Sequence, residues 1–329
     1  MDKKIIVAGH VSLDITPVFP SENSYMNVAD CFLPGTLINV EGAVISPGGV
    51  VSNTGLALRK MGADVSLIGK TGNDNFGRTL RGLYADKGAD GLLCCDGATT
   101  SFTMILAAPG IDRIFLYCPG ANDTFVSDDI SDEALEGAAL FHFGYPPLMR
   151  SMYEDGGAEL VRLFRRIKEK GILTSLDMAA VDPNGDCAKT DWRRVLEDVL
   201  PYVDYFEPSL EEILCMLGPD CRTAEQAAEE CFALGAKTVL IKCGADGLYY
   251  RSAGCRGHQS AFEVPFVASA TGAGDTCIAA FLYSILDGRS VTESVRYAAA
   301  QGACCVTAYD TVSGLKTMDE LEEMIKNAG

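Results

Sequence analysis

Apolar positions in this chain fall into two patterns, short continuous runs and longer stretches with helical spacing. Short runs rich in β-branched and aromatic residues are typical of buried strands, and the longer stretches are typical of helices. The two patterns alternate along most of the sequence, which predicts a parallel sheet built from β-α units. The predicted strands are 4–9, 65–69, 140–143, 172–177, 203–206, 238–242 and 248–251, and the predicted helices are 76–87, 157–170, 192–200, 209–217, 224–234, 277–286, 292–308 and a last one from 319.

The most informative stretch is 269–276, Ser-Ala-Thr-Gly-Ala-Gly-Asp-Thr, which precedes an apolar helical run. Two glycines let the backbone pass close to a bound group, and the unpaired amides and dipole of a helix start favour an anion there. Asp275 would repel a phosphate unless it accepts a proton from the attacking hydroxyl. Loop amides beside such a base are the parts of a phosphoryl-transfer site. An ordinary helix start with an acidic first turn is the alternative.

Two segments, 15–45 and 99–126, interrupt the β-α alternation. In the second, apolar runs at 101–106 and 113–117 flank a Pro-Gly-Ile-Asp turn, which predicts a hairpin. Together the two segments predict a small β lid over the core, and a plain edge hairpin is the alternative. The lid is favoured because phosphate transfer requires that water is excluded.

A second candidate ligand site lies in the N-terminal part of the chain. Asp14 follows the first strand at its carboxyl end, which is where open α/β sheets bind ligands. Gly48-Gly49 permits a tight turn and close backbone approach, and a helix follows it. Asn53 falls in the first turns of that helix. Its side chain points either to solvent or to a hydroxylated ligand, and spacing alone leaves both open.

Composition limits the classes of function. The chain has 329 residues, of which 48% are hydrophobic and 22% charged, as in ordinary globular proteins. Its formal net charge of −18 argues against nucleic-acid binding, which demands a basic face. We find no apolar run long enough for a signal peptide or a membrane span, so we expect no membrane partner and a cytoplasmic location. The thirteen cysteines show no metal-ligand spacing, and we expect buried, reduced thiols.

Two signatures, in order along the chain, resemble those of one family. Gly-Gly followed four residues later by Asn, at 48–53, and Thr-Gly-Ala-Gly-Asp before an apolar helix, at 271–275, are typical of the ribokinase-like (phosphofructokinase-B type) carbohydrate kinases. The likeness extends over nearly the whole chain and indicates a single domain, residues 1–329, with the lid inserted. It implies a ribokinase-like three-layer α/β/α core with a mostly parallel central sheet, a small β lid, and transfer of the ATP γ-phosphate to a hydroxyl.

The resemblance also implies roles for individual residues. Asp275 is the general base, and the amides of Gly272, Ala273 and Gly274 form the anion hole. The substrate-side positions are Asp14, Gly48, Gly49 and Asn53, with Arg113 on the lid as their basic neighbour. The nucleotide-side positions are Ser209, Lys242, Gly244, Gly247 and Thr271. Glu212 matches a family glutamate that acts on Mg²⁺ through water, so ATP and Mg²⁺ are the implied cofactors.

The chain also departs from the family pattern. Ser209 stands where the family has Asn, and Lys242 stands where a nucleotide-contacting Thr is usual. Ser269 replaces an Asp that often helps to bind a monovalent cation, so we expect only weak dependence on K⁺. Val50 replaces the Lys of ribokinases proper. The sequence therefore predicts a family member that is not a plain ribokinase.

We predict a kinase that acts on a small neutral sugar, because the substrate-side positions other than Arg113 lack a basic group to pair with a sugar phosphate. A nucleoside kinase of the same fold is the alternative, with Phe102, Phe115 and Tyr117 as an aromatic sandwich for the base. The intact Asp275 motif disfavours a non-catalytic sugar sensor. A dinucleotide-binding enzyme is disfavoured because Gly-x-Gly-x-x-Gly does not follow the first strand. By analogy, apolar lid residues predict a homodimer.

Overall fold

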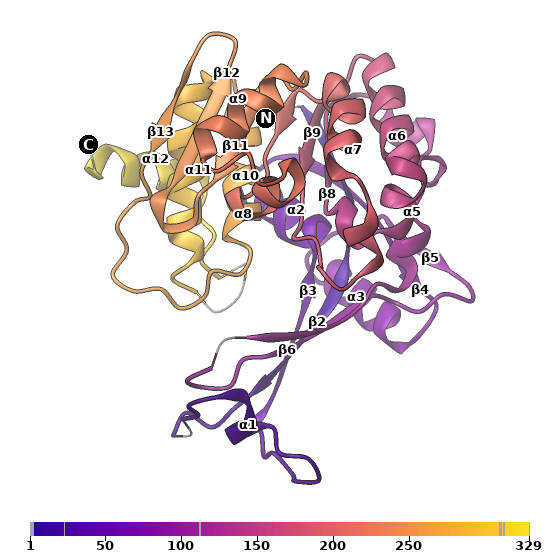
Figure 1. The fold of residues 1–329 in the computed structure, drawn as a ribbon, viewed down its shortest axis with the longest axis vertical. Helices are drawn as coiled ribbons and strands as arrows, with labels where there is room; N and C mark the ends of the chain where they lie inside the picture. Colours follow the sequence, from indigo (N-terminus) through magenta and orange to yellow (C-terminus); the bar gives the residue numbers. More distant parts are fainter. Residues whose placement is uncertain (1–2, 23, 112, 309–310, 312, 329) are drawn as a thin grey trace.

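The computed structural model describes residues 3–22, 24–111, 113–308, 311 and 313–328. Within these residues it contains a nine-stranded sheet in the order β13-β12-β11-β10-β9-β8-β1-β4-β5 (Figure 1). Neighbouring strands from β5 to β11 are parallel, and β12 and β13 are antiparallel additions at one edge. The strands are β1 (Lys4–Gly9), β4 (Asp64–Gly72), β5 (Leu92–Cys95), β8 (Ala138–Gly144), β9 (Leu173–Asp177), β10 (Tyr205–Phe206), β11 (Thr238–Lys242), β12 (Leu248–Ser252) and β13 (Arg256–Gln259).

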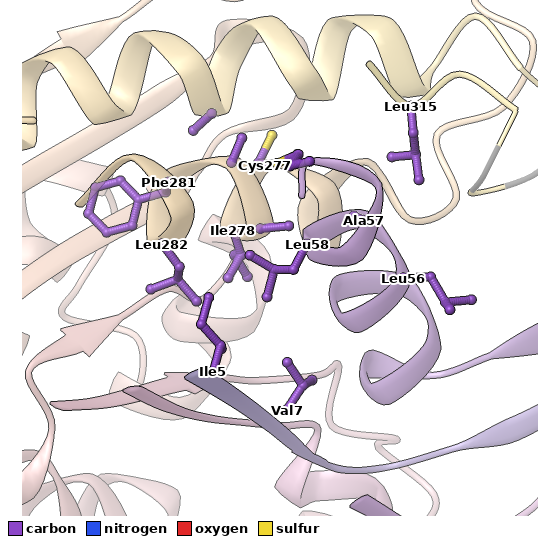
Figure 2. Packing of buried hydrophobic residues seen from close by; sticks show 14 of the residues in the cluster. Ile5, Val7, Leu56, Ala57, Leu58, Cys277, Ile278, Phe281, Leu282 and Leu315 are labelled. Carbon is purple, nitrogen blue, oxygen red and sulfur yellow. The ribbon is translucent and has the colours of Figure 1, made fainter. Parts of the chain in front are cut away.

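Successive side chains of β1 point to opposite faces of this sheet and enter two separate apolar cores. Ile5 and Val7 belong to one core, where Figure 2 shows them near Ile278 of α10, and Ile6 and Ala8 belong to the other. The helices of the first core are α2 (Val50–Lys60), α3 (Asn75–Ala85), α10 (Ala273–Leu286), α11 (Val291–Cys305) and α12 (Met318–Ala328). The helices of the second are α4 (Asp132–Leu135), α5 (Arg150–Tyr153), α6 (Ala158–Glu169), α7 (Trp192–Val199), α8 (Leu210–Leu217) and α9 (Ala224–Ala233). This arrangement confirms the predicted three-layer α/β/α class.

A second sheet, in the order β3-β2-β6-β7, projects from the core (Figure 1). It pairs β2 (Ser12–Val18) with β3 (Gly42–Gly48), and β6 (Phe102–Leu106) with β7 (Ile114–Cys118). The predicted hairpin is therefore confirmed, and the two segments that interrupt the β-α alternation share one sheet. The short helix α1 (Val28–Cys31) lies between β2 and β3, at the far end of this projection.

Two strands of the large sheet, β5 and β13, were not predicted from the sequence. β5 is short and mostly half-exposed at one edge, and β13 reads Arg-Gly-His-Gln, which carries no apolar pattern. Both are outermost strands, so they bury little apolar surface of their own. Their backbones pair because β4 and β12 present unpaired edges.

All thirteen cysteines are free; six of them are buried as expected, five are intermediate, and Cys94 and Cys215 are exposed. In the described part of the chain, we find no helix with the length and apolar character to cross a bilayer.

Candidate active site

Asp275 lies in the first turn of α10, behind a left-handed turn at Gly272. The φ of Gly272 is 74°, and a Cβ there would lie 2.3 Å from Cγ2 of Thr311, so both backbone and space require glycine. The Ala273 amide donates to the carbonyl of Ala270 at 3.3 Å, which closes the turn that starts the helix. The sequence thus folds locally to place a carboxylate beside the amides of a helix start.

The Asp275 carboxylate is buried and bonded by three other side chains. The Tyr145 hydroxyl lies 2.8 Å from each carboxylate oxygen, and Asn53 Nδ2 donates to Oδ2 at 3.1 Å. Thr54 Oγ1 lies 3.4 Å from Oδ1. Burial raises the pKa of Asp275, against the opposing effects of the Lys242 ammonium and of the bonds from Tyr145 and Asn53.

Lys242, the last residue of β11, places a largely buried cation next to this turn, with 12% of its side chain exposed. Its Nζ lies 2.6 Å from Asp177 Oδ1, and a Cβ on Gly274 would lie 3.2–3.4 Å from the end of the Lys242 side chain. Burial alone would lower the pKa of Lys242, but the carboxylates of Asp177, Glu212 and Asp275 outweigh burial and raise it. Lys242 therefore carries its charge beside the glycine loop.

The substrate-side residues of the N-terminal part converge on the same place. Burial raises the pKa of Asp14 to about 6, and Ser12 donates to its Oδ1 at 2.7 Å. A Cβ on Gly48 would lie 2.1–2.4 Å from the Asp14 carboxyl atoms, and one on Gly49 would lie 2.6 Å from His10 Nδ1. Both positions therefore require glycine, because Asp14 and His10 lie too close to leave room for a side chain. Asn53 faces Asp275 rather than solvent, and its buried Oδ1 accepts no hydrogen bond from the described residues.

The predicted nucleotide-side residues lie on neighbouring elements. Thr271 Oγ1 accepts a bond of 2.7 Å from Arg113, which joins the projecting sheet to the glycine loop. Ser209 and Glu212 form a reciprocal cap at the start of α8. Gly244 begins the turn between β11 and β12, and Gly247 ends it with φ 95°.

A cleft of about 910 Å³ adjoins this turn. It is lined by Gln259, Ala261, Phe262, Arg296 and Met324, among others. A Cβ on Gly247 would meet the backbone of Gln259 and Ala261, so the turn packs against two of the residues that line the cleft.

The structure adds three residues to which sequence reasoning gave no role in the site, His10, Tyr145 and Asp177. Tyr145 contacts Asp275, His10 packs on the Tyr145 ring at 5.8 Å between centroids, and Asp177 pairs with Lys242. Each follows or ends a parallel strand at its carboxyl end. The rule that singled out Asp14 marks each of them as a candidate, although it does not show that they meet.

The predicted aromatic sandwich is wrong for Phe102. Register pairs Thr103 of β6 with Asp14 and Tyr117, so Phe102 points to the opposite face of that sheet. There it packs edge-on against Phe76 of α3, with ring centroids 5.3 Å apart. Only Phe115 and Tyr117 of the three are left on the face of Asp14.

Comparison with known proteins shows which family this chain resembles. The model of the pfkB family of carbohydrate kinases matches residues 2–318. Probable fructokinase-4 of Arabidopsis thaliana is 26% identical over 302 residues, covering 88% of this chain and 91% of the relative. Fructokinase-1 of Zea mays is 27% identical over 297 residues, covering 86% and 89%.

Solved structures agree in fold. A ribokinase from Thermotoga maritima superposes with a TM-score of 0.77 at 22% identity, covering 98% of this chain and 99% of its own. A fructokinase with bound ATP from Xylella fastidiosa gives 0.79 at 20% identity, with 99% of both chains covered. A nucleoside kinase from Burkholderia thailandensis, in complex with inosine, gives 0.74 at 17% identity and 98% coverage of both. The chain therefore belongs to the pfkB family of carbohydrate kinases, and it is a carbohydrate kinase.

Proposed function

We propose that this kinase transfers the γ-phosphate of ATP to a hydroxyl of a small neutral sugar, with Asp275 as the general base. The observation that carries the proposal is the position of the Asp275 carboxylate. It is buried at the start of α10, and the substrate-side residue Asn53 bonds it directly. Two further findings support the proposal: the curated relatives above are called fructokinases, and a fructokinase of this fold was solved with ATP.

In the proposed reaction the acceptor hydroxyl donates its hydrogen bond to Asp275. Its oxygen attacks the γ-phosphorus, the bond from that phosphorus to the β-γ bridging oxygen breaks, and ADP leaves. The hydroxyl proton passes to the Asp275 carboxylate. The amides of Gly272, Ala273 and Gly274 and the Lys242 ammonium offset the charge on the transferred phosphoryl group. Lys242 suits this role because it is largely buried, charged and next to Gly274.

The residues present also fit a divalent cation. Ser209, which Glu212 caps, forms a β-bridge with Lys242, so Glu212 stands at the start of α8 next to the strand that ends at Lys242. Mg²⁺ is usually held by one or two carboxylates together with waters and phosphates, and bound there it would neutralise phosphate charge. One Glu212 oxygen accepts from the Ser209 amide at 2.7 Å, which leaves Glu212 suited to contact through water. For K⁺ we propose weak dependence, because Ser269 supplies a neutral hydroxyl.

A sugar acceptor fits the pocket better than a nucleoside. Asp14, a carboxyl group, and Asn53, with a buried unpaired carbonyl oxygen, are suited to bonding vicinal hydroxyls. The aromatic sandwich considered for a nucleobase loses Phe102, which lies on the other face of the sheet, and keeps only Phe115 and Tyr117. The nucleoside kinase stays as the second candidate, since a kinase of this fold was solved with inosine.

The projecting sheet β3-β2-β6-β7 is proposed to act as the lid of this single domain. Its support is that Arg113 bonds Thr271 of the glycine loop while Tyr117 bonds His10 beside Asp275. Exposed apolar side chains of the same sheet, such as Val44, Ile45 and Leu116, support a homodimer through the lid. Light scattering on the purified protein tests the dimer. A cytoplasmic location is part of the same proposal.

The deciding experiment is an ADP-release screen over neutral sugars, sugar phosphates and nucleosides, run in parallel on the parent and on Asp275→Asn. We expect the highest kcat/KM for a neutral sugar and almost no turnover by the variant. A best substrate among the nucleosides would replace the first candidate by the second. If no acceptor in any class raises ADP release above background, the transferase proposal fails.

A further inference from the structure

Tyr145 holds a backbone conformation that a tyrosine rarely adopts. Its φ is 68° and its ψ 41°, in the left-handed region, between the end of β8 and the 3₁₀ helix η3 (Pro146–Leu148). The following residue is Pro146, which itself favours extended backbone at the position before it. A bulky residue persists there only when its surroundings hold it, and such strain gathers at functional sites.

Several contacts hold Tyr145 in this conformation. Its amide donates to the Asp177 carbonyl at 3.3 Å, and its hydroxyl lies 2.8 Å from both oxygens of Asp275. The preceding Gly144 has no room for a side chain, because a Cβ would lie 2.5 Å from Val50. The Tyr145 ring rests on His10, with centroids 5.8 Å apart.

His10 in turn connects Tyr145 to the lid sheet. His10 Nε2 lies 3.0 Å from the hydroxyl of Tyr117, on β7, and that hydroxyl donates to the carbonyl of Leu148 at 3.0 Å. A continuous series of contacts therefore runs from the lid through His10 and Tyr145 to Asp275.

We propose that Tyr145 is a positioning residue for the general base, whose hydroxyl, held in place through His10 and Tyr117, orients the Asp275 carboxylate and keeps it ionised. The inference rests on the proposed function, because it assumes that Asp275 is the base. Tyr145 belongs to neither family signature and stands apart from the motif of Asp275 by 130 positions.

The direction of the hydrogen bond follows from burial and charge. Burial and the neighbouring carboxylates Asp275 and Asp177 raise the pKa of Tyr145 well above its ordinary value, so the phenol stays protonated and donates. A donated bond stabilises the carboxylate over the carboxylic acid and lowers the pKa of Asp275. The charged groups that also act on Asp275 are the Lys242 ammonium, which lowers this pKa as the Asn53 bond does, and the carboxylate of Glu212, which raises it. Asp14 and Asp177 are further like charges, because Asp275 raises the pKa of each.

A different role for Tyr145 would change kcat/KM in the opposite direction when its hydroxyl is removed. The Tyr145 hydroxyl could simply occupy the place that the acceptor hydroxyl takes when it binds Asp275. Removing it would then open the pocket, lower the acceptor KM and raise kcat/KM. A positioning role predicts a lower kcat with nearly unchanged acceptor KM.

The test is the pH profile of ADP release, measured for kcat and acceptor KM between about pH 5 and 9, in the parent, Tyr145→Phe and Tyr84→Phe. Tyr84 is the matched control, because it is a buried tyrosine of α3 whose hydroxyl bonds Ser52 of α2 at 2.7 Å. For Tyr145→Phe we expect the acid limb of kcat/KM to move up by about one to two pH units, because the ionised carboxylate loses a bond from a neutral donor. The loss of kcat/KM should be roughly tenfold at pH values on the acid limb and smaller at high pH. Tyr84→Phe should keep the parental profile.

An unchanged acid limb in Tyr145→Phe, or a lower acceptor KM with raised kcat/KM, would overturn the inference. If Tyr145→Phe does not fold, Tyr117→Phe tests the same contacts and should shift the acid limb in the same direction by a smaller amount. An unchanged acid limb in Tyr117→Phe would then also overturn the inference. Asp275→Asn is included as the reference. Near-parental activity of that variant would reject the proposed function itself, whereas an inactive Asp275→Asn beside an unaltered Tyr145→Phe profile rejects only the positioning role.

Discussion

Replacing Asp275 by Asn separates catalysis from stability in this protein. The substitution removes the proton acceptor and keeps the size of the side chain. An Asn amide that replaces Oδ1 faces Thr54 Oγ1, now 3.4 Å away, which is able to accept its hydrogen bond. The remaining oxygen still accepts from Asn53 and Tyr145. Thr54 thus provides an acceptor for one N–H of the new amide, and the variant should retain the fold.

The expected loss of activity is large. A general base is worth roughly 10² to 10⁴ in turnover, or ~2.7–5.5 kcal/mol at 1.36 kcal/mol per tenfold. ATP affinity should change little, because Asp275 is proposed to act on the acceptor hydroxyl. ADP release at saturating ATP measures the loss, and nucleotide titration measures the affinity. Activity within a few-fold of the parent would remove Asp275 from its role.

The expected effect on stability has the opposite sign. The net pKa of Asp275 is raised in the folded state, chiefly by burial, so folding disfavours the charged form. Charge on Asp275 then lowers stability above the pKa of the unfolded chain, about 3.9, and this penalty grows as pH rises through the folded pKa. The neutral variant should melt at the same temperature as the parent near pH 4, and at the same or a higher temperature at pH 8. A variant that melts well below the parent at pH 8 would refute this reasoning.

Three further predictions follow from the site. Gly274→Val should lower turnover by at least about 10²-fold with the fold retained, because its methyl groups would displace Lys242, which lies 3.2–3.4 Å from the position of a Cβ; melting curves separate this from misfolding, and an active variant would place the phosphate elsewhere. Exchanging tetramethylammonium for K⁺ should change the rate little, because Ser269 is neutral; a large activation would show a cation site built from other groups. Fructose 1-phosphate, fructose 6-phosphate and tagatose 6-phosphate should be poor acceptors beside neutral sugars; a far higher kcat/KM for any of them would contradict the neutral pocket.

The part of the site that the sequence predicts is the part that is contiguous along the chain. The run from Thr271 to Asp275 has its glycines, base and helix within a few residues, so local chemistry alone indicates its role. Gly48, Gly49 and Asn53 form a second such run. In both cases the structure supplies the reason, because added side chains would collide with Asp14, His10 or Thr311.

The residues that the sequence misses are brought together by topology. His10, Tyr145 and Asp177 are far apart along the chain, but β1, β8 and β9 are neighbours in the sheet and end at the same edge. Their meeting depends on the order of strands, which periodicity does not reveal. Phe102 shows the same limit, since an aromatic residue in a hairpin can face either side and only the pairing with Leu13 decides which.

The added residues change the charge of the site and with it the argument about the acceptor. The sequence offers Asp14, Glu212 and Asp275 as acidic groups, and the structure adds Asp177 to the same electrostatic environment. Lys242 is the cation that offsets these carboxylates, and it is already paired with Asp177. Arg113, the other basic candidate, donates to Thr271 on the nucleotide side. An acceptor that brought a second phosphate would meet this surplus of negative charge in a buried, weakly screened place, whereas the hydroxyls of a neutral sugar can donate to the same carboxylates.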